Sequence, residues 1–228
     1  RFCNILYNII YFIIYEYFNI NINMSGYLII MLHSFMGNPI EMIYYQKYLN
    51  RILKNNVSYI SPKAPTRTIT IYNNKKYNAW YDYYTEYCIK EEEINCHHLF
   101  AQCNRIHNLI DKESQKTPLE NIYLMGYSQG ACTALSAGIT YPKPLGGIIG
   151  LKGHIPSCIY DHKQGVKQRI LVAHGKKDSV IGYKIAEESY KLYKKRGYDI
   201  TFLSQDKANH DASSGIREQM KYIEKFIV

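Results

Sequence analysis

The fold of this chain is decided by one stretch of its sequence, Asn121-Ile122-Tyr123-Leu124-Met125-Gly126-Tyr127-Ser128-Gln129-Gly130-Ala131-Cys132. An apolar run that favours a β-strand ends there in Gly-x-Ser-x-Gly and continues into residues that favour a helix. This order predicts a nucleophile elbow, a sharp strand-to-helix turn that lifts a serine hydroxyl above the end of a sheet. A side chain at Gly126 or Gly130 would collide with the backbone of so tight a turn, and Ser128 must hold a strained conformation. Ser128 is therefore the first candidate for a functional side chain.

Apolar runs and helical patterns alternate along the rest of the chain. The expected strands are 27–32, 57–60, 121–127, 145–151, 169–173 and 200–203. The expected helices are 40–53, 91–110, 129–139, 183–196 and 214–227. Strands that alternate with helices predict an α/β protein, with a mostly parallel sheet of about six strands and helices on both faces.

Composition sets the class of protein. A length of 228 residues suits one domain with a sizeable core, and 46% hydrophobic with 21% charged residues excludes a disordered chain. The net charge of +9 is spread over scattered basic residues. No nucleic-acid-binding motif accompanies them, so we expect no nucleic-acid partner.

The six cysteines show no paired spacing, which favours free thiols in a reducing compartment over a disulfide framework. Cys96, Cys103 and His107 fall on one face of an expected helix, which leaves a metal site as an alternative. Small apolar cysteines more often face a core, and we predict no metal site.

The first 23 residues differ from the rest. Glu16 is the one charged residue from Phe2 to Ile22, and the apolar length fits a signal peptide or a membrane anchor. Several asparagines interrupt the run, and Met24-Ser25-Gly26 resembles an ordinary start before the first core strand. We expect residues 1–23 to be translated upstream sequence or a dispensable extension, and residues 24–228 to form a single domain. A genuine anchor is the alternative.

Polar candidates follow three of the expected strands at their carboxyl ends, where functional groups collect in such a sheet. Ser128 follows the third strand, Asp178 the fifth and His210 the sixth, which is the order of an α/β-hydrolase triad. His210 would act as the general base on the serine hydroxyl, and Asp178 would hold the imidazole in the required tautomer. Asp206 and Asp211 compete with Asp178 for this role because they lie close to His210 in sequence.

The tetrahedral oxyanion of such a reaction needs two donors fixed in advance. We expect the backbone N–H groups of Gln129, directly after the nucleophile, and of Phe35, in the loop after the first strand. His33 and His174 precede tight turns and are expected to orient loops by hydrogen bonds.

Three further residues are candidates for binding substrate. Met36 and Trp80 would line an acyl groove, with core packing as an equal alternative. His154 follows the fourth expected strand and would line the cleft, with a surface position as its alternative.

These residues resemble the acyl-protein thioesterase, or phospholipase/carboxylesterase, family of α/β-hydrolases, over about residues 27–227. The segments that carry the resemblance are Leu32-His33-Ser34-Phe35, Pro62-Lys63-Ala64-Pro65-Thr66-Arg67 with Ile69-Thr70, Ala79-Trp80-Tyr81-Asp82, Gly126-Tyr127-Ser128-Gln129-Gly130, residues 141–148, and His174-Gly175 with Asp178 and His210. Ser34 stands where the family usually has glycine, Ala131 replaces a common second glycine, and His154 replaces tyrosine or phenylalanine. A start at Met24 would leave out the family's opening strands and reduce the sheet to six strands.

The resemblance implies an α/β-hydrolase fold with a minimal lid or none, and hydrolysis of carboxylic esters or thioesters through an acyl-enzyme. It implies S-acylated proteins or lysophospholipids as substrates, no metal or organic cofactor, and a cytoplasmic monomer or weak homodimer with at most transient contact with a membrane surface. The alternatives are a short-chain serine esterase of another branch, a catalytically silent hydrolase-fold binding protein, and a lipase tethered to a membrane by residues 1–23.

Overall fold

The computed structural model describes residues 26–86, 88–161 and 166–228. The expected extension, residues 1–23, lies outside the described residues. Within these three ranges, no helix combines the length and the apolar character needed to cross a lipid bilayer.

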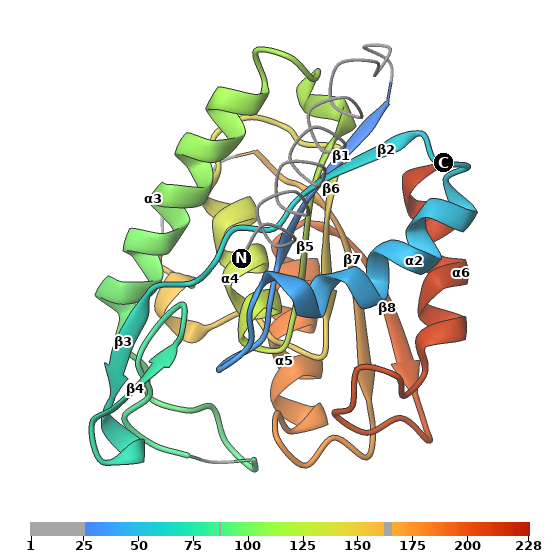
Figure 1. The fold of residues 1–228 in the computed structure, drawn as a ribbon. Coiled ribbons are helices and arrows are strands. Elements are labelled where there is room, and N and C mark those ends of the chain that lie inside the picture. Colours follow the sequence, from blue (N-terminus) through green and yellow to red (C-terminus); the bar gives the residue numbers. More distant parts are fainter. Residues whose placement is uncertain (1–25, 87, 162–165) are drawn as a thin grey trace, which may run out of the picture.

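Six strands form one parallel sheet in the order β2-β1-β5-β6-β7-β8 (Figure 1). Its strands are β1 (Tyr27–Leu32), β2 (Val57–Ile60), β5 (Ile122–Tyr127), β6 (Gly147–Leu151), β7 (Arg169–Gly175) and β8 (Asp199–Gln205). The central strands β5 and β6 are buried along their whole length, because helices cover both faces of a parallel sheet. The predicted fold class is confirmed.

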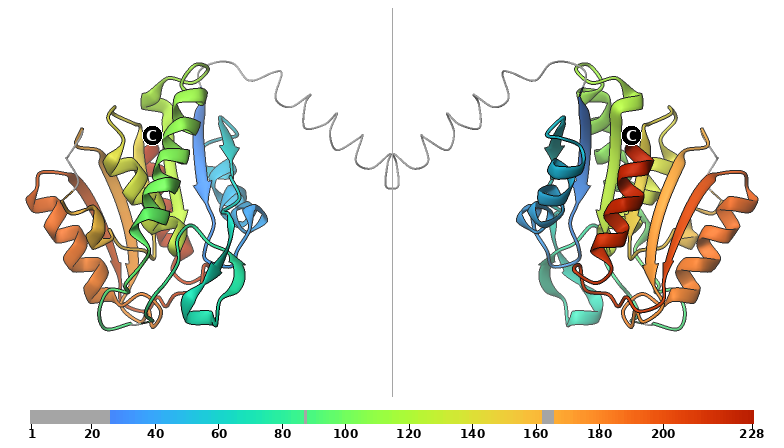
Figure 2. Two further views of the ribbon diagram at one scale, coloured as in Figure 1. Left: turned by 90° about the vertical axis from the view of Figure 1, so that its left-hand side faces the viewer. Right: turned by 90° about the vertical axis from the view of Figure 1, so that its right-hand side faces the viewer.

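The helices form one layer on each face of the sheet (Figures 1 and 2). One layer contains α3 (Cys96–Glu113), α4 (Gln129–Thr140) and α5 (Tyr183–Lys195), and the other contains α2 (Ile43–Ile52) and α6 (Ile216–Ile227). Successive residues of a strand point to opposite faces. Ile30 of β1 therefore packs in the core beneath α3 and α4, whereas Ile29 packs beneath α2 and α6.

The structure differs from the expected elements in three places. The helix expected from residue 91 begins at Cys96, because the side chain of Asn95 caps it and accepts a hydrogen bond from the His98 N–H at 3.0 Å. The helix expected over 40–53 is divided into the 3-10 turn η1 (Pro39–Met42) and α2. The segment between Pro65 and Trp80 contains a two-stranded antiparallel hairpin that we did not predict.

The hairpin and the remaining short turns lack the apolar runs that predict strands and helices from a sequence. The hairpin strands are β3 (Thr66–Ile69) and β4 (Lys75–Asn78), and the 3-10 turns are η2 (Thr70–Tyr72), η3 (Leu119–Asn121) and η4 (Ser157–Ile159). Thr and Arg fill three of the four positions of β3, and Lys and Asn fill three of the four positions of β4, so no alternation of apolar and polar residues marks these strands. The hairpin turns at Asn73 and Asn74, whose backbones are left-handed with φ of 53° and 56°.

Candidate active site

The nucleophile elbow has the strained geometry that its sequence predicts. Ser128 lies between β5 and α4 with φ of 55° and ψ of −125°, a conformation that is rare for a residue with a side chain. A Cβ atom on Gly126 would lie 2.1 Å from the carbonyl oxygen of Gly130. One on Gly130 would lie 2.2 Å from the carbonyl oxygen of Leu32. Both positions therefore require glycine, and the turn aims Ser128 beyond the carboxyl end of the sheet.

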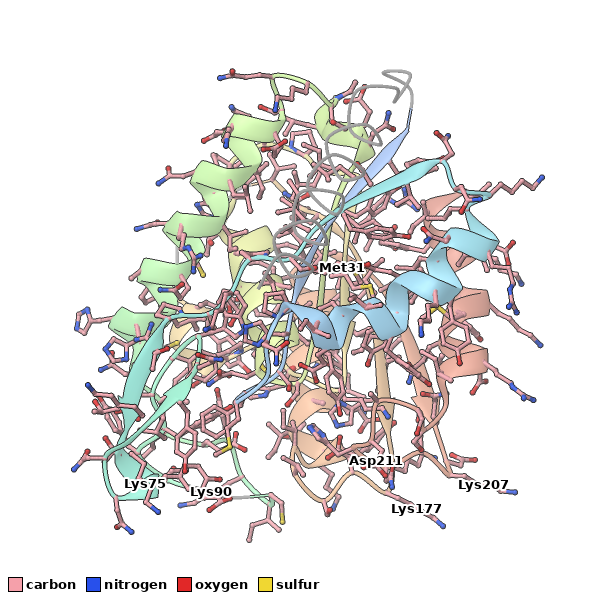
Figure 3. The ribbon with its side chains drawn as sticks, viewed as in Figure 1. Met31, Lys75, Lys90, Lys177, Lys207 and Asp211 are labelled. Atoms are coloured by element: carbon pink, nitrogen blue, oxygen red, sulfur yellow. The ribbon has the colours of Figure 1, made fainter. Side chains whose placement is uncertain are left out.

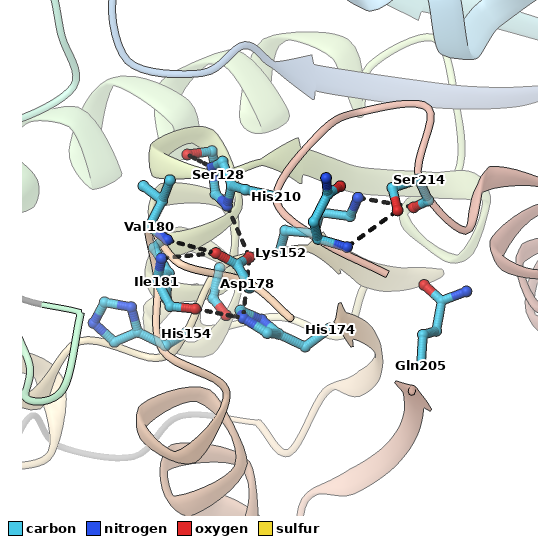
Figure 4. Close-up of polar contacts among 12 residues, drawn as sticks. Ser128, Lys152, His154, His174, Asp178, Val180, Ile181, Gln205, His210 and Ser214 are labelled. Atoms are coloured by element: carbon cyan, nitrogen blue, oxygen red, sulfur yellow. Dashed lines mark hydrogen bonds and ion pairs between the residues drawn. The ribbon is translucent and has the colours of Figure 1, made fainter. Parts of the chain in front are cut away.

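Ser128, His210 and Asp178 come together from the ends of β5, β8 and β7 (Figure 4). The Nε2 atom of His210 lies 3.0 Å from Ser128 Oγ, and Nδ1 lies 2.8 Å from Asp178 Oδ2. When Nδ1–H donates to the carboxylate, Nε2 is left as the acceptor for the serine hydroxyl. The arrangement places the imidazole within hydrogen-bonding reach of a hydroxyl on one side and of an orienting carboxylate on the other.

The carboxylate of Asp178 is held on both oxygens. Its Oδ1 accepts the backbone N–H groups of Val180 and Ile181, both at 2.9 Å, while Oδ2 faces His210. Burial raises the pKa of this carboxyl, but the hydrogen bond from His210 and the other donors outweigh it, so the pKa of Asp178 lies below its usual value. Asp178 is therefore ionised at neutral pH.

The other two candidate acids have different partners. Asp206 pairs with Lys176 at 2.8 Å on the surface, and Asp211 Oδ2 accepts a hydrogen bond from Asn209 at 2.8 Å. Of the three aspartates, the one that contacts His210 is Asp178.

The two expected oxyanion donors, the backbone N–H groups of Phe35 and Gln129, follow the carboxyl ends of β1 and β5. Among the described residues, no acceptor is bonded to the backbone N–H of Phe35 or of Gln129. The Gln129 side chain accepts the N–H of Trp80 at 2.9 Å and donates to the carbonyl of Tyr81 at 2.9 Å, which fixes the first turn of α4. Both N–H groups are thus available as donors.

His33 and His174 are fully buried and hydrogen-bonded to backbone. His33 Nε2 accepts the N–H of Ala64 at 3.0 Å, and His174 Nε2 lies 2.8 Å from the carbonyl oxygen of Ile181. Burial lowers the pKa of both imidazoles. Each ring ties a loop at the site to a neighbouring loop.

Ser128 and His210 open into a cavity of about 540 Å³. Its apolar wall includes Phe35, Ile71, Tyr72, Tyr83, Val180 and Ile181. Carboxylates of Glu41, Glu86 and Glu92 also reach it. The volume lies within the range typical of small-molecule sites, and Ser128 lies in the cavity wall.

The three candidate substrate-binding residues do not line this cavity. Trp80 is fully buried, with its indole N–H donating to the carbonyl of His33 at 2.8 Å. His154 is also buried, with Nε2 3.3 Å from Glu91, whereas Met36 is 43% exposed. Trp80 therefore packs in the core, where the His33 carbonyl supplies the hydrogen-bond acceptor that a buried indole needs. A groove role for the three residues has no support in this geometry.

The helix face that suggested a metal alternative makes other contacts. His107 Nε2 lies 2.7 Å from the carbonyl oxygen of Ala137, and Cys103 is buried in the core. In the part of the chain that the structure describes, no three His, Cys, Asp or Glu side chains form a group that could hold a metal ion.

Three residues that the sequence did not single out contact the site. Glu41 accepts hydrogen bonds from Ser34, in the loop after β1 that carries Phe35. Tyr127 and Lys152 donate to the loop that carries His210.

Comparisons with known proteins show the family of this chain. Residues 23–228 match the phospholipase/carboxylesterase family. The chain is 28% identical over 178 residues to carboxylesterase SOBER1 of Arabidopsis thaliana, covering 76% of this chain and 77% of that protein. It is 38% identical over 102 residues to acyl-protein thioesterase 1 of Schizosaccharomyces pombe, but this match covers 44% of the chain and 45% of the relative, less than half of that protein's length.

Solved structures show the same architecture. The crystal structure of Arabidopsis thaliana SOBER1 matches with a TM-score of 0.80 at 25% identity, covering 89% of this chain and 98% of that one. Zea mays acyl-protein thioesterase 2 matches with a TM-score of 0.74 at 21% identity, covering 90% and 96% respectively, which is a likeness of fold.

Proposed function

This chain belongs to the phospholipase/carboxylesterase family, and we propose that it hydrolyses carboxylic esters or thioesters with Ser128 as the nucleophile. The observation that carries the proposal is the pair of short contacts made by the His210 ring, 3.0 Å to Ser128 Oγ and 2.8 Å to Asp178 Oδ2. The acyl-protein thioesterase and carboxylesterase names of the relatives support the same chemistry. We assign the activity to residues 24–228.

Acylation begins when His210 Nε2 takes the hydroxyl proton of Ser128 as Oγ attacks the carbonyl carbon of the substrate. The carbonyl oxygen becomes an oxyanion, and the N–H groups of Phe35 and Gln129 donate to it. The bond to the leaving alcohol or thiol then breaks, and that group takes the proton from His210. An acyl ester on Ser128 remains.

Deacylation repeats the sequence with water. His210 takes a proton from the water molecule, hydroxide adds to the acyl carbon, and the second tetrahedral intermediate releases the carboxylic acid as Ser128 regains its proton. Asp178 keeps its charge throughout and stabilises the imidazolium that forms twice in each cycle. Its lowered pKa supports this role, since the carboxylate does not compete for the proton.

The substrate class follows from the relatives and the cavity. Thioesterase relatives support an acyl thioester or ester, with S-acylated proteins and lysophospholipids as the candidate substrates. The apolar side chains Phe35, Val180 and Ile181 beside Ser128 offer a surface for an acyl chain. A short-chain esterase is the second candidate, supported by the carboxylesterase name of SOBER1.

The test compares the wild-type protein with Ser128→Ala on p-nitrophenyl esters of two to sixteen carbons and on a palmitoyl thioester. Serine-dependent turnover that rises with chain length would support thioesterase or lysophospholipase activity. An optimum at short chains would support a general carboxylesterase. Folded wild-type protein without Ser128-dependent turnover on any substrate would favour the silent binding protein.

A further inference from the structure

Lys152 is a buried lysine directly beneath the candidate active site. It follows β6, is 1% exposed, and has a left-handed backbone with φ of 55°. Its own N–H donates to the carbonyl of Ala173 in β7 at 2.8 Å. Lysine is rarely buried without partners, because removal of the ammonium from water is costly unless hydrogen bonds replace the lost ones.

The partners of the Lys152 side chain are backbone carbonyls of the His210 loop, residues 206–215 between β8 and α6 (Figure 4). Its Nζ donates to the carbonyl of Asp211 and, at 2.8 Å, to that of Ser214. From β5, the hydroxyl of Tyr127 donates to the carbonyl of His210 itself. Tyr127 at the end of β5 and Lys152 directly after β6 thus hold the loop at His210 and at the residues that follow it.

The loop has no helix or strand of its own, so its position depends on contacts with the rest of the chain. Near its two ends, the Lys177 N–H donates to the Ala208 carbonyl at 3.0 Å and Gln205 Nε2 donates to the Gly215 carbonyl at 3.1 Å. Its internal hydrogen bonds are short-range, such as Ser214 N–H to the carbonyl of Asp211 at 2.9 Å. They shape the loop but do not fix it to the sheet. The His210 ring must nevertheless stay within bonding distance of Ser128 and Asp178, which project from other strands.

We propose that Lys152 is a positioning residue, which anchors the backbone of the His210 loop to the end of β6 and so keeps the imidazole aligned with Ser128 and Asp178. Among the described residues, the hydrogen bonds of Lys152 Nζ go to loop carbonyls and not to Ser128, Asp178 or the His210 ring, so Lys152 acts through the loop. The proposal rests on the proposed function, since it assigns His210 as the base of that reaction. It also gives Tyr127 a role, because phenylalanine at this position would lack the second anchor.

The Lys152 amine can hold the loop carbonyls whether it is charged or neutral. Burial lowers the pKa of Lys152 to about 8, while the nearby carboxylates of Asp178 and Asp211 act in the opposite direction. A neutral amine still has two N–H groups, and the two carbonyls of Asp211 and Ser214 need two donors. The hydrogen bonds therefore persist in both protonation states.

The test is Lys152→Met in the full chain, with Lys207→Met as the matched control. Methionine has nearly the same length but no donor, and Lys207 lies in the same loop with its side chain pointing away from the molecule (Figure 3). We expect Lys152→Met to lower kcat on a p-nitrophenyl ester by about 10- to 100-fold with little change in KM, because a displacement of roughly 1 Å in a catalytic group has an effect of this size. Lys207→Met should match the wild type.

Two further readouts separate positioning from general stability. Phosphonylation of Ser128 by a fluorophosphonate should slow by the same factor as kcat, and the downfield proton resonance of the His210–Asp178 hydrogen bond should weaken or disappear. Tyr127→Phe should show the same pattern to a smaller degree. If Lys152→Met does not fold, Lys152→Gln, which keeps two N–H donors on a shorter side chain, takes its place with the same readouts.

A folded Lys152→Met protein with wild-type kcat, labelling rate and proton resonance would overturn the inference. So would a loss confined to thermal stability or to KM. Failure of the proposed function looks different, since the wild-type protein itself would then show no Ser128-dependent labelling.

Discussion

Glu41 accepts hydrogen bonds from both the backbone N–H and the hydroxyl of Ser34, at 2.9 and 2.8 Å. Ser34 lies directly before the expected oxyanion donor Phe35. A Cβ atom on Gly37 would lie 2.3 Å from the Glu41 carboxylate, so the loop is packed closely around this contact. The Ser34 hydroxyl therefore gives the loop that carries Phe35 a second hydrogen bond to Glu41 in η1.

This contact predicts that Glu41→Ala lowers both turnover and thermal stability. Hydrogen bonds to a charged group contribute about 1.5–3 kcal/mol each, and their loss frees the loop that presents Phe35. We expect kcat to fall by about tenfold, as measured with a p-nitrophenyl ester. The control is the same substitution in a Ser34→Gly background, where the partner is reduced to a backbone N–H and the loss should be smaller. Equal losses in both backgrounds would show that Glu41 acts independently of Ser34.

Asp178→Asn should lower kcat by about 10⁴, since an amide no longer holds the imidazole in the required tautomer. The fold should be retained, because asparagine has the same shape and its oxygen can still accept from the N–H groups of Val180 and Ile181. Asp206→Asn is the matched control, since its side chain pairs with Lys176 on the surface. Near-full activity of Asp178→Asn would reassign the acid to Asp206 or Asp211.

The buried amine of Lys152 makes stability depend on pH. Its pKa is about 8 in the folded protein, below the ordinary value of 10.5, because burial disfavours the ammonium. Between these two values the unfolded chain binds more protons than the folded one, so the free energy of unfolding rises with pH in that window. Denaturant titrations at pH 7.5 and 10 should therefore show the wild type gaining stability relative to Lys152→Met. An unchanged difference between the two proteins would mean that the folded pKa is not lowered.

Much of the fold could be predicted from the sequence because its signals are local. The strands of a sheet buried on both faces are continuous apolar runs, and the apolar run Tyr27–Leu32 begins and ends where the sequence indicated. The half-buried edge strand Val57–Ile60 also has the predicted bounds. The sequence signal for the nucleophile elbow is also local, because Gly126, Ser128 and Gly130 lie within five residues of the chain. The polar hairpin of β3 and β4 was missed because its strands carry no alternating pattern.

The contacts that support the site could not be predicted in the same way, because their partners are far apart in sequence. Lys152 lies 59 residues from Asp211 in the sequence. The residues next to Lys152 form no pattern that predicts burial of its amine. For Trp80, the sequence left the substrate groove and core packing as equal alternatives. Its burial depends on an acceptor 47 residues away, the carbonyl of His33. Pairings of this kind are fixed by packing rather than by local pattern.

The central claim is that Ser128 is a nucleophile activated by His210. Its most direct test is intact-mass and peptide analysis of the full chain after exposure to a fluorophosphonate, with Ser128→Ala and His210→Ala alongside. The account predicts a single adduct on Ser128, no adduct in Ser128→Ala, and labelling slower by several orders of magnitude in His210→Ala, since triad members act as a unit. A folded wild-type protein that forms no adduct, or forms it on another residue, would contradict the account.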